Sequence, residues 1–249
     1  MYEAVHAHPD GEATPARYAA TAARYGYDGI IVRTREALEP ASASEGGGAD
    51  PATAPARDPD ALADEYDVDV VDAVEIDVES AQSAAGAVGN HRPDRTVLCL
   101  VGGEDGLNRF AVEEPRVDVL SRPMAGSGEF NHVLAKAARD NDVHVEFDFG
   151  PLLRATGGER VRALSDLRKL REIVTYYDAP HVVSANPRSH LELRAPRELV
   201  AAGEAVGFEP EWIRDGLRAW ESIATRNRER RSGAFIEPGV RRGRYEEDR

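Results

Sequence analysis

The sequence predicts an α/β protein that folds as a TIM-like β/α barrel. Short apolar stretches of strand character recur seven times, and helix-period stretches lie between several of them. This alternation is typical of a mainly parallel sheet covered by helices. The length of 249 residues suits a barrel, for which about 250 residues are usual. An open doubly wound sheet is the alternative, but no Gly-x-Gly-x-x-Gly turn follows the first predicted strand, so nothing marks a dinucleotide site.

The predicted strands are runs rich in Val, Ile, Leu and Phe, residue types that pack well on a buried pleated surface. In chain order they lie around Val5 and at 30–32, 68–76, 97–101, 117–120, 143–149 and 182–183. The single cysteine, Cys99, lies inside the fourth run, where we expect it to pack in the core.

Helical periodicity predicts the elements between and after the strands. Four stretches have apolar residues at helical spacing, at 16–25, 79–88, 131–140 and 160–177. A further helix is predicted over 209–231, where Trp212, Ile213, Leu217, Trp220 and Ile223 are spaced to form an apolar stripe.

Two segments stand apart from the predicted barrel domain, which we place at residues 1–231. From 39 to 61 no side chain is more apolar than alanine, and this segment includes three consecutive glycines and four prolines. Such a composition predicts a disordered insertion. Residues 232–249 are too few and too polar for a core of their own, which predicts a flexible C-terminal tail.

The charge balance indicates a salt-adapted protein. The chain carries 31 Lys and Arg against 45 Asp and Glu, a net charge of -14, and only Lys136 and Lys169 are lysines. Concentrated salt screens the self-repulsion of such a surface, so we expect a halophilic archaeal source. Residues 1–120 hold 9 basic and 24 acidic residues, whereas 121–249 hold 22 and 21. Either the second half faces a polyanion, or the acidic half serves solubility alone.

Membrane and secreted classes are disfavoured. No segment contains the run of roughly 18 apolar residues that a membrane-spanning helix needs. The N-terminus, Met-Tyr-Glu-Ala-Val-His, lacks the basic start and apolar stretch of a signal peptide. One cysteine cannot form an internal disulfide. We therefore expect a cytoplasmic protein that makes no membrane contact.

Two histidine-containing patterns could carry chemistry. His6 and His8 alternate in the first predicted strand, so both imidazoles would share a face and could bind one metal; a pair of hydrogen-bonded histidines near a strand end is the alternative. His144, Glu146 and Asp148 share a face of the sixth predicted strand. They could form a metal or acid/base cluster, but a polar barrel interior held by internal hydrogen bonds is favoured.

Basic residues cluster near predicted strand ends and on helices, and arginine's planar fork suits bidentate phosphate contacts. A turn after the seventh strand adds small polar groups. Solvated helix faces with Glu–Arg pairing are the alternative for any single arginine. We expect contacts with RNA or a partner at Arg122, Lys136, Arg139, Arg168, Lys169, Ser184, Asn186, Arg188, Arg194 and Arg197.

A series of motifs resembles one known family. It comprises Ser-Arg-Pro at 121–123, Asn-His-Val-Leu-Ala-Lys-Ala-Ala-Arg-Asp-Asn at 131–141, Val-Glu-Phe at 145–147, the stretch 164–170, Val-Val-Ser at 182–184, Leu-Arg-Ala-Pro-Arg-Glu-Leu at 193–199 and Gly-Phe at 207–208. In this order the motifs resemble the archaeal ribonuclease P protein component 3 family. The resemblance covers roughly residues 2–35 and 66–215; the insertion and the residues after 226 fall outside it.

The resemblance implies a barrel related to the PHP phosphoesterases and a role as a protein subunit of ribonuclease P, which removes 5′ leaders from precursor tRNA. It implies that RNA is the catalyst and that Mg²⁺ serves the RNA, with no cofactor in this chain. The implied partners are the catalytic RNA, a Pop-five-like protein, other ribonuclease P proteins and, for the holoenzyme, precursor tRNA.

The chain departs from PHP enzymes at their metal ligands. His6 and His8 match the opening His-x-His, but Val32-Arg33-Thr34 replaces Thr-Asp-His, and Ser-Ala-Asn-Pro at 184–187 replaces Ser-Asp-Ala-His. We therefore predict neither a metal centre nor a catalytic residue. Two rival functions remain, a stand-alone PHP-like metal-dependent phosphoesterase and a protein-interaction module that docks through the stripe at 212–223.

Overall fold

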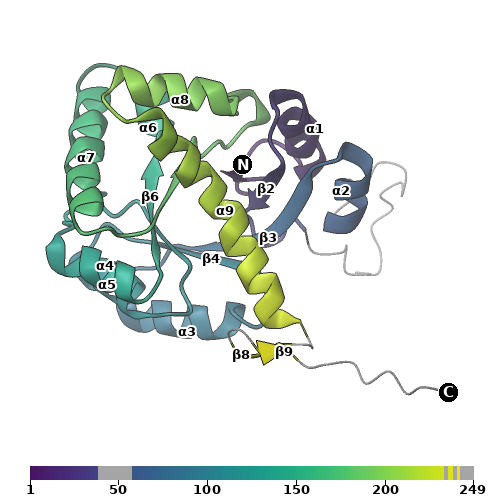
Figure 1. Ribbon diagram of the computed structural model, residues 1–249, viewed down its shortest axis with the longest axis horizontal. Helices are drawn as coiled ribbons and strands as arrows, with labels where there is room; N and C mark the ends of the chain where they lie inside the picture. Colours follow the sequence, from purple (N-terminus) through teal and green to yellow (C-terminus); the bar gives the residue numbers. More distant parts are fainter. Residues whose placement is uncertain (39–57, 233–234, 238–239, 242–249) are drawn as a thin grey trace.

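Seven parallel strands follow one another around the core of the protein in sequence order. The computed structural model describes residues 1–38, 58–232, 235–237 and 240–241 (Figure 1). The strands are β1 (Tyr2–Val5), β2 (Gly29–Val32), β3 (Asp69–Ile76), β4 (Val97–Val101), β5 (Val119–Ser121), β6 (His144–Asp148) and β7 (His181–Ser184). Each pairs in parallel with the next, so all seven carboxyl ends open at one mouth.

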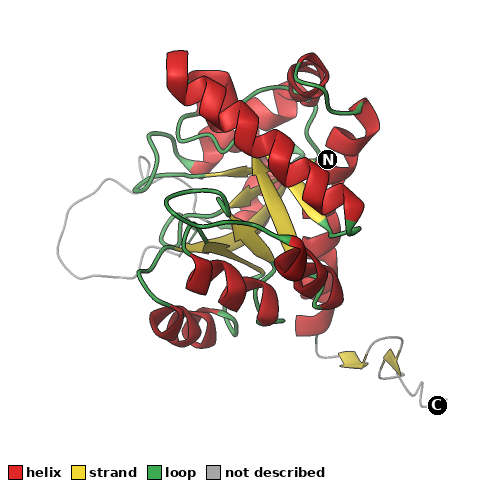
Figure 2. Ribbon diagram, turned by 90° about the vertical axis from the view of Figure 1, so that its left-hand side faces the viewer, coloured by secondary structure: helices red, strands yellow, loops and turns green. Residues whose placement is uncertain are grey.

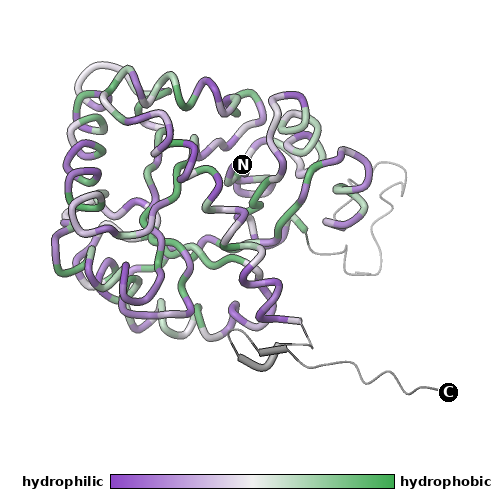
Figure 3. The backbone as a smooth tube through the Cα atoms, in the orientation of Figure 1, coloured by the Kyte–Doolittle hydropathy of each residue, from purple (hydrophilic) through white to green (hydrophobic). Residues whose placement is uncertain are grey.

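Helices surround the sheet, which lies at the centre in yellow in Figure 2. They are α1 (Pro15–Tyr25), α2 (Pro59–Tyr66), α3 (Ala81–His91), α4 (Asp105–Glu113), α5 (His132–Asp140), α6 (Gly150–Arg154), α7 (Gly157–Tyr176), α8 (Pro196–Ala205) and α9 (Pro210–Arg231), with a short 3₁₀ turn at His190–Glu192. Proline occupies the first turn of α1, α2, α8 and α9, where its missing N–H costs no helical hydrogen bond. Figure 3 shows the apolar strands inside and polar helix faces outside.

The barrel closes between β1 and β7 through side chains. These two strands are the ends of the hydrogen-bonded series rather than neighbours in it. The Glu3 carboxylate bridges them, because its Oε1 accepts from the Ser184 hydroxyl at 2.7 Å and from the Ala185 backbone N–H at 3.0 Å. Above this seam the His6 N–H donates to the Pro187 carbonyl at 3.0 Å.

Helix α9 crosses the amino ends of the strands and fills the barrel from below. Trp220, Ile223 and Ala224 of α9 pack in one buried cluster with inward residues of the strands, among them Ala4 and Cys99. The Trp220 indole N–H donates to the Val183 carbonyl at 3.0 Å. Figure 1 shows α9 running diagonally across the molecule from α8 to β8 (Phe235–Glu237). The predicted apolar stripe of this helix is therefore a core face of the barrel.

The predicted barrel and its seven strands are confirmed, with strand ends displaced by one or two residues. Helices α2, α4, α6 and α8 are additional to the predicted ones. Because α2 begins at Pro59 with Asp58 as its cap, the last three positions of the predicted insertion 39–61 are helical, which corrects that boundary. Residues 39–57 lie outside the described residues. Within the predicted tail 232–249, β8 pairs antiparallel with β9 (Val240–Arg241). No helix in the described part of the chain is both long and apolar enough to cross a membrane.

Candidate functional site

A network of buried charges occupies the barrel mouth. Arg33 follows β2, and its side chain is 0% exposed. Its Nη1 donates to Glu75 at 2.9 Å and to Glu146 at 3.1 Å, while its Nη2 contacts the second oxygen of Glu146. The guanidinium carbon lies 5.1 Å from the centre of the Trp220 ring. Arg33 therefore sits inside the barrel, between the α9 indole below and two carboxylates at the mouth.

Pairing favours the charged forms of Arg33 and Glu75 despite their burial. Burial is the largest single influence and would lower the pKa of Arg33, but the negative groups around it, Glu146 foremost and Glu75 among them, together outweigh burial and raise that pKa well above its usual value. Burial would raise the pKa of Glu75, but Arg33, with His6 and Arg122, holds it below its usual value. Buried charges persist in proteins when they are paired in this way.

Beside this network, Asn186 joins His6 to Asp148. Its Oδ1 lies 2.7 Å from His6 Nε2, and its Nδ2 donates to Asp148 at 2.8 Å. Burial and then the nearby Glu146 carboxylate raise the pKa of Asp148 to about 6, and burial followed by the charge of Arg33 lowers the pKa of His6. Glu146 and Asp148 thus confirm the predicted polar interior held by internal hydrogen bonds. His144 lies at the opposite end of β6 from Asp148.

The mouth does not fit the metal centre of a PHP-type enzyme. The expectation that His6 and His8 share a strand face is wrong, because β1 ends at Val5, His6 is buried and His8 is exposed. The Arg33 guanidinium already neutralises Glu75 and Glu146. No group of three or more His, Cys, Asp or Glu among the described residues could hold a metal ion. Among the described residues, the positive charge that contacts both Glu75 and Glu146 is the guanidinium of Arg33.

Ser184 belongs to the seam rather than to a binding surface. Its side chain is fully buried, and its hydroxyl donates to Glu3, so the expectation of an RNA or partner contact at Ser184 is corrected. Burial raises the pKa of Glu3 to about 7 in spite of hydrogen bonds from Ser184 and Ala185. Asn186, half-buried, also serves internal contacts.

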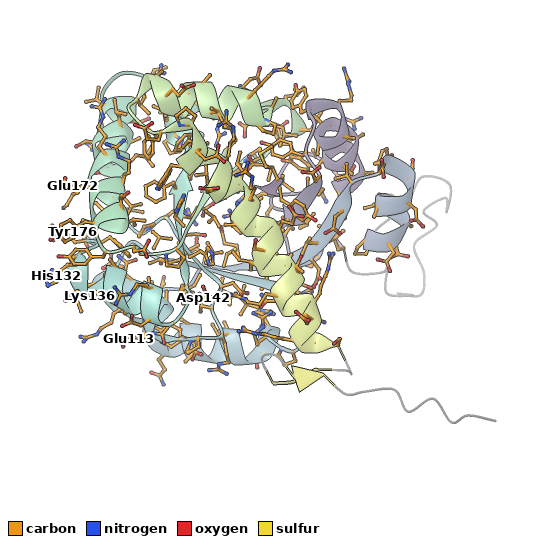
Figure 4. The ribbon with its side chains drawn as sticks, viewed as in Figure 1. Glu113, His132, Lys136, Asp142, Glu172 and Tyr176 are labelled. Atoms are coloured by element: carbon orange, nitrogen blue, oxygen red, sulfur yellow. The ribbon has the colours of Figure 1, made fainter. Side chains whose placement is uncertain are left out.

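Four of the predicted contact residues lie on α5 and α7, on the side of the molecule where Figure 4 labels Lys136 and Tyr176. The four are Lys136, Arg139, Arg168 and Lys169, all exposed. Arg168, Lys169 and Tyr176 also line a groove of about 760 Å³ between α7 and the start of α9. We call these four cations together with this groove the α7 basic face.

The aromatic component of the α7 basic face was missed by the sequence reasoning. Tyr176 is 79% exposed, and its ring lies 4.8 Å from that of Tyr177. Lys136 Nζ lies 5.3 Å from the Tyr177 ring. The signal was available, since a Tyr-Tyr pair ends a helix in a chain with only 6% aromatic residues.

The remaining predicted contacts lie around the mouth and on α8. Arg122 pairs with Glu75 at 3.3 Å and with Asp77 at 3.2 Å. Arg188 donates to the Asp10 carbonyl and Arg194 to the Leu191 and Leu193 carbonyls, so both are tied to loops. Arg197 is exposed in the first turn of α8. The ten predicted residues therefore do not form one site, and the largest group among these ten is the set of four on α5 and α7.

Comparison with known families identifies the chain. The family model described as RNase P subunit p30 matches residues 1–232. The chain belongs to the RNase P subunit p30 family. The match includes the insertion, which the predicted resemblance left out.

The p30 family assignment agrees with the curated relatives. The chain is 79% identical to ribonuclease P protein component 3 of Halorubrum lacusprofundi over 100% of both chains. It is 54% identical to the protein of the same name from Haloarcula marismortui, covering 97% of this chain and 96% of the relative. It is 34% identical to that of Methanosarcina barkeri, covering 90% and 88%. Haloarchaeal relatives at high identity support the predicted salt adaptation.

Solved structures show the fold of this p30 member. A chain in the cryo-EM structure of archaeal ribonuclease P with mature tRNA superposes with a TM-score of 0.78 at 22% identity over 100% of both chains. A histidinol phosphate phosphatase from Lactococcus lactis superposes with a TM-score of 0.50 at 10% identity, covering 84% of this chain and 94% of the phosphatase. The p30 barrel therefore shares its architecture with a phosphatase.

Proposed function

We propose that the chain supports the catalytic RNA of ribonuclease P from its surface, with the α7 basic face as the RNA contact. The chain is a protein subunit of the ribonucleoprotein that removes the 5′ leader of precursor tRNA, and catalysis lies in the RNA. The family match over residues 1–232 carries this conclusion. The Arg33 network supports it, because a buried guanidinium paired with Glu75 and Glu146 stands where the PHP pattern Thr-Asp-His would supply metal ligands.

Charge and stacking are the physical means by which the α7 basic face would act. Closely packed RNA phosphates repel one another, and arginine or lysine beside them reduces the Mg²⁺ that the RNA needs. In molar salt the release of counterions contributes little, so bidentate contacts and base stacking carry more of the affinity. The exposed ring of Tyr176 next to Arg168 and Lys169 supplies both kinds of contact.

The expected partners and setting follow from the same role. The chain acts with ribonuclease P RNA, other protein subunits and tRNA; a Pop-five-like protein is the proposed direct protein partner. Mg²⁺ would be bound by the RNA and not by this chain. The described residues contain no membrane-spanning helix, and a cytoplasmic location is proposed with the tRNA-processing role.

The first test is purification of the tagged chain from its native host in molar KCl, with sequencing of the RNA that accompanies it. We expect strong enrichment of ribonuclease P RNA and cleavage of precursor tRNA in the eluate. Recovery of a chain free of RNA but stoichiometric with zinc or manganese would contradict the proposal in favour of a phosphoesterase.

The second test addresses the α7 basic face. Arg168→Ala with Lys169→Ala should lower holoenzyme activity severalfold at limiting Mg²⁺, and added Mg²⁺ should restore it, because Mg²⁺ replaces the lost neutralisation. The matched control is Arg17→Ala with Arg24→Ala, two exposed arginines seven positions apart on α1. Equal activity of the two double variants at limiting Mg²⁺ would remove the α7 basic face from the RNA interface.

A further inference from the structure

A small apolar cleft opens beside the charge network at the barrel mouth. Its volume is about 250 Å³. Met124, in the loop after β5, lies on one wall, and Ala163 and Leu167 of α7 lie on the other. Small-molecule sites usually measure about 300–1,000 Å³, so this mouth cleft has the size for a single long side chain.

The lining of the mouth cleft includes a carboxylate, Asp148, that forms no ion pair with a described residue. Asp148 accepts hydrogen bonds from the Gly150 N–H at 2.7 Å and from Asn186 at 2.8 Å. Both donors are neutral, and none of the ion pairs between described residues includes Asp148. Arg33 is engaged by Glu75 and Glu146, and Arg122 by Glu75 and Asp77. Arg154, which also lies beside Gly150, donates to the Ala185 and Asn186 carbonyls and pairs with Glu192. Asp148 therefore has no cation of its own within the described chain, although the charge of Arg33 acts on it from a distance.

The whole lining of the mouth cleft is acidic on balance. Its side chains include four carboxylates and two arginines. Glu146 is already paired with Arg33, and Arg122 with Glu75 and Asp77. This leaves the carboxylates of Asp148, Glu159 and Asp166 against the single guanidinium of Arg162. Glu159 and Asp166 stand at the outer side on α7. An excess of carboxylates repels RNA phosphates and attracts a cation, so the charge favours a basic protein side chain over a nucleotide.

We propose that the mouth cleft receives an arginine of a partner protein, whose guanidinium pairs with Asp148 while its aliphatic stem lies between Met124 and Leu167. Arginine suits the site because it combines an apolar stem with a planar fork that binds a carboxylate through two N–H groups. The inference rests on the proposed subunit role, since it assigns part of the assembly surface to a protein partner. RNA is thereby bound by the α7 basic face and protein by the mouth.

Cross-linking in the intact particle tests the occupant directly. Glu159→p-benzoylphenylalanine places a photoreactive group beside the cleft, and Glu172→p-benzoylphenylalanine places the same group on α7 at an exposed position that does not line it. The particle is purified from the native host in molar KCl, irradiated, digested and analysed by mass spectrometry. We expect the variant at 159, and not the one at 172, to cross-link to a partner-protein peptide that contains an arginine. Cross-linking of the variant at 159 to RNA, to a second copy of this chain or to nothing would overturn the inference.

Two substitutions then separate charge from shape. Asp148→Asn removes the charge and keeps an oxygen acceptor, and Ala163→Phe fills the cleft without touching Asp148. Each should weaken retention of the cross-linked protein, by roughly 30-fold for Asp148→Asn, since truncating a buried charge pair costs at least that much. The controls Asp64→Asn on α2 and Ala201→Phe on α8, both exposed, should change nothing. Full retention by both cleft variants would overturn the inference.

Failure of this inference and failure of the proposed function are distinguishable in the same preparation. If the unaltered chain brings no ribonuclease P RNA, the subunit role fails. If the RNA is present but the variant at 159 gives no protein cross-link, the role stands and only the assignment of the mouth cleft falls.

Discussion

At the scale of single residues, Arg33 decides what the barrel mouth can be. A guanidinium that is wholly buried and shared by Glu75 and Glu146 supplies the positive charge that these carboxylates need. The same carboxylates without it would be an uncompensated negative cluster, which is the usual setting for a bound cation. The Arg33 side chain thus balances the charge of a barrel mouth that would otherwise need a bound cation.

Removing the guanidinium should destabilise the fold strongly. Arg33→Ala leaves Glu75 and Glu146 without their partner, and breaking a buried pair costs about 3–5 kcal/mol. We expect the free energy of unfolding to fall by about that amount in equilibrium denaturation in molar KCl. Arg17→Ala, at an exposed position on α1, should change it by less than about 0.5 kcal/mol. If Arg33→Ala and Arg17→Ala lower the free energy of unfolding by similar amounts, the fold does not depend on the charge network around Arg33.

Glu3, in the seam between β1 and β7, makes the stability of the protein depend on pH. Because burial raises the pKa of Glu3 from 4.5 to about 7, the folded state binds a proton more tightly than the unfolded state between these values. Stability therefore falls as pH rises from about 4.5 to about 7, by a few kcal/mol at most.

The test compares the native chain with Glu3→Gln, which keeps an oxygen for Ser184 and Ala185 but does not titrate. His144, whose pKa is lowered to about 4 chiefly by burial, contributes stability that grows with pH between about 4 and 6.5, and it acts in both proteins. The difference between their free energies of unfolding isolates Glu3, and we expect it to move in favour of Glu3→Gln as pH rises. A difference that stays constant from pH 4.5 to 8 would contradict the assignment.

At the scale of elements, the packing of α9 against β7 depends on one close approach, between Gly216 and Val183. A Cβ at Gly216 would lie 2.5 Å from Val183 Cγ2 and 3.0 Å from the Val183 backbone N, so only glycine lets the helix lie this close to β7. Trp220, one turn later, then reaches the barrel interior. The position of α9 is thus set by the missing side chain of Gly216 and by the large side chain of Trp220.

Gly216→Ala should therefore destabilise the protein by about 1–3 kcal/mol through overpacking. Gly86 in the middle of α3 provides the matched control, because a Cβ there meets nothing within 4 Å. Gly86→Ala should stabilise by roughly 0.5–1 kcal/mol, since alanine is the better former of a helix interior. Thermal denaturation of the pair should give melting temperatures displaced in opposite directions, and equal displacements would contradict the packing argument.

The elements also show how far the sequence could be interpreted. The strands were predictable because each is a dense apolar run, and α7 and α9 because they are long. Helix α4 was not, since its apolar residues, Leu107, Phe110, Ala111 and Val112, lie within a helix of only nine residues, too short for the periodicity to stand out. The Arg33 network could not be predicted because its partners lie 42 and 113 positions away. A lone arginine directly after Ile-Ile-Val was its only local signal.

At the scale of the whole molecule, the net charge of -14 dominates behaviour in solution. Self-repulsion of the acidic surface opposes the compact state, and salt screens it, with a Debye length of about 10 Å at 0.1 M and about 3 Å at 1 M. The described ion pairs that are exposed, such as Arg109–Glu113, contribute little in comparison.

We therefore expect stability to rise with KCl concentration. The free energy of unfolding, measured by thermal denaturation at fixed pH, should increase between 0.1 M and 2 M KCl. Sorbitol serves as the uncharged control. At osmolalities matched to KCl below 0.5 M, it should not raise the free energy of unfolding as KCl does. A curve that is flat or falls with KCl would show that the acidic excess serves solubility only.

The seam between β1 and β7 also sets an order of events during synthesis. Glu3 is made 181 positions before its Ser184 partner, and α9 follows Ser184 in the chain. Strand β1 must therefore wait with a carboxylate and an apolar face unsatisfied until β7 and α9 have been synthesised. Such distant pairing slows folding and exposes the nascent chain to aggregation. We therefore expect the acidic residues of segment 1–120 to keep the nascent chain soluble until β7 and α9 are available to close the barrel.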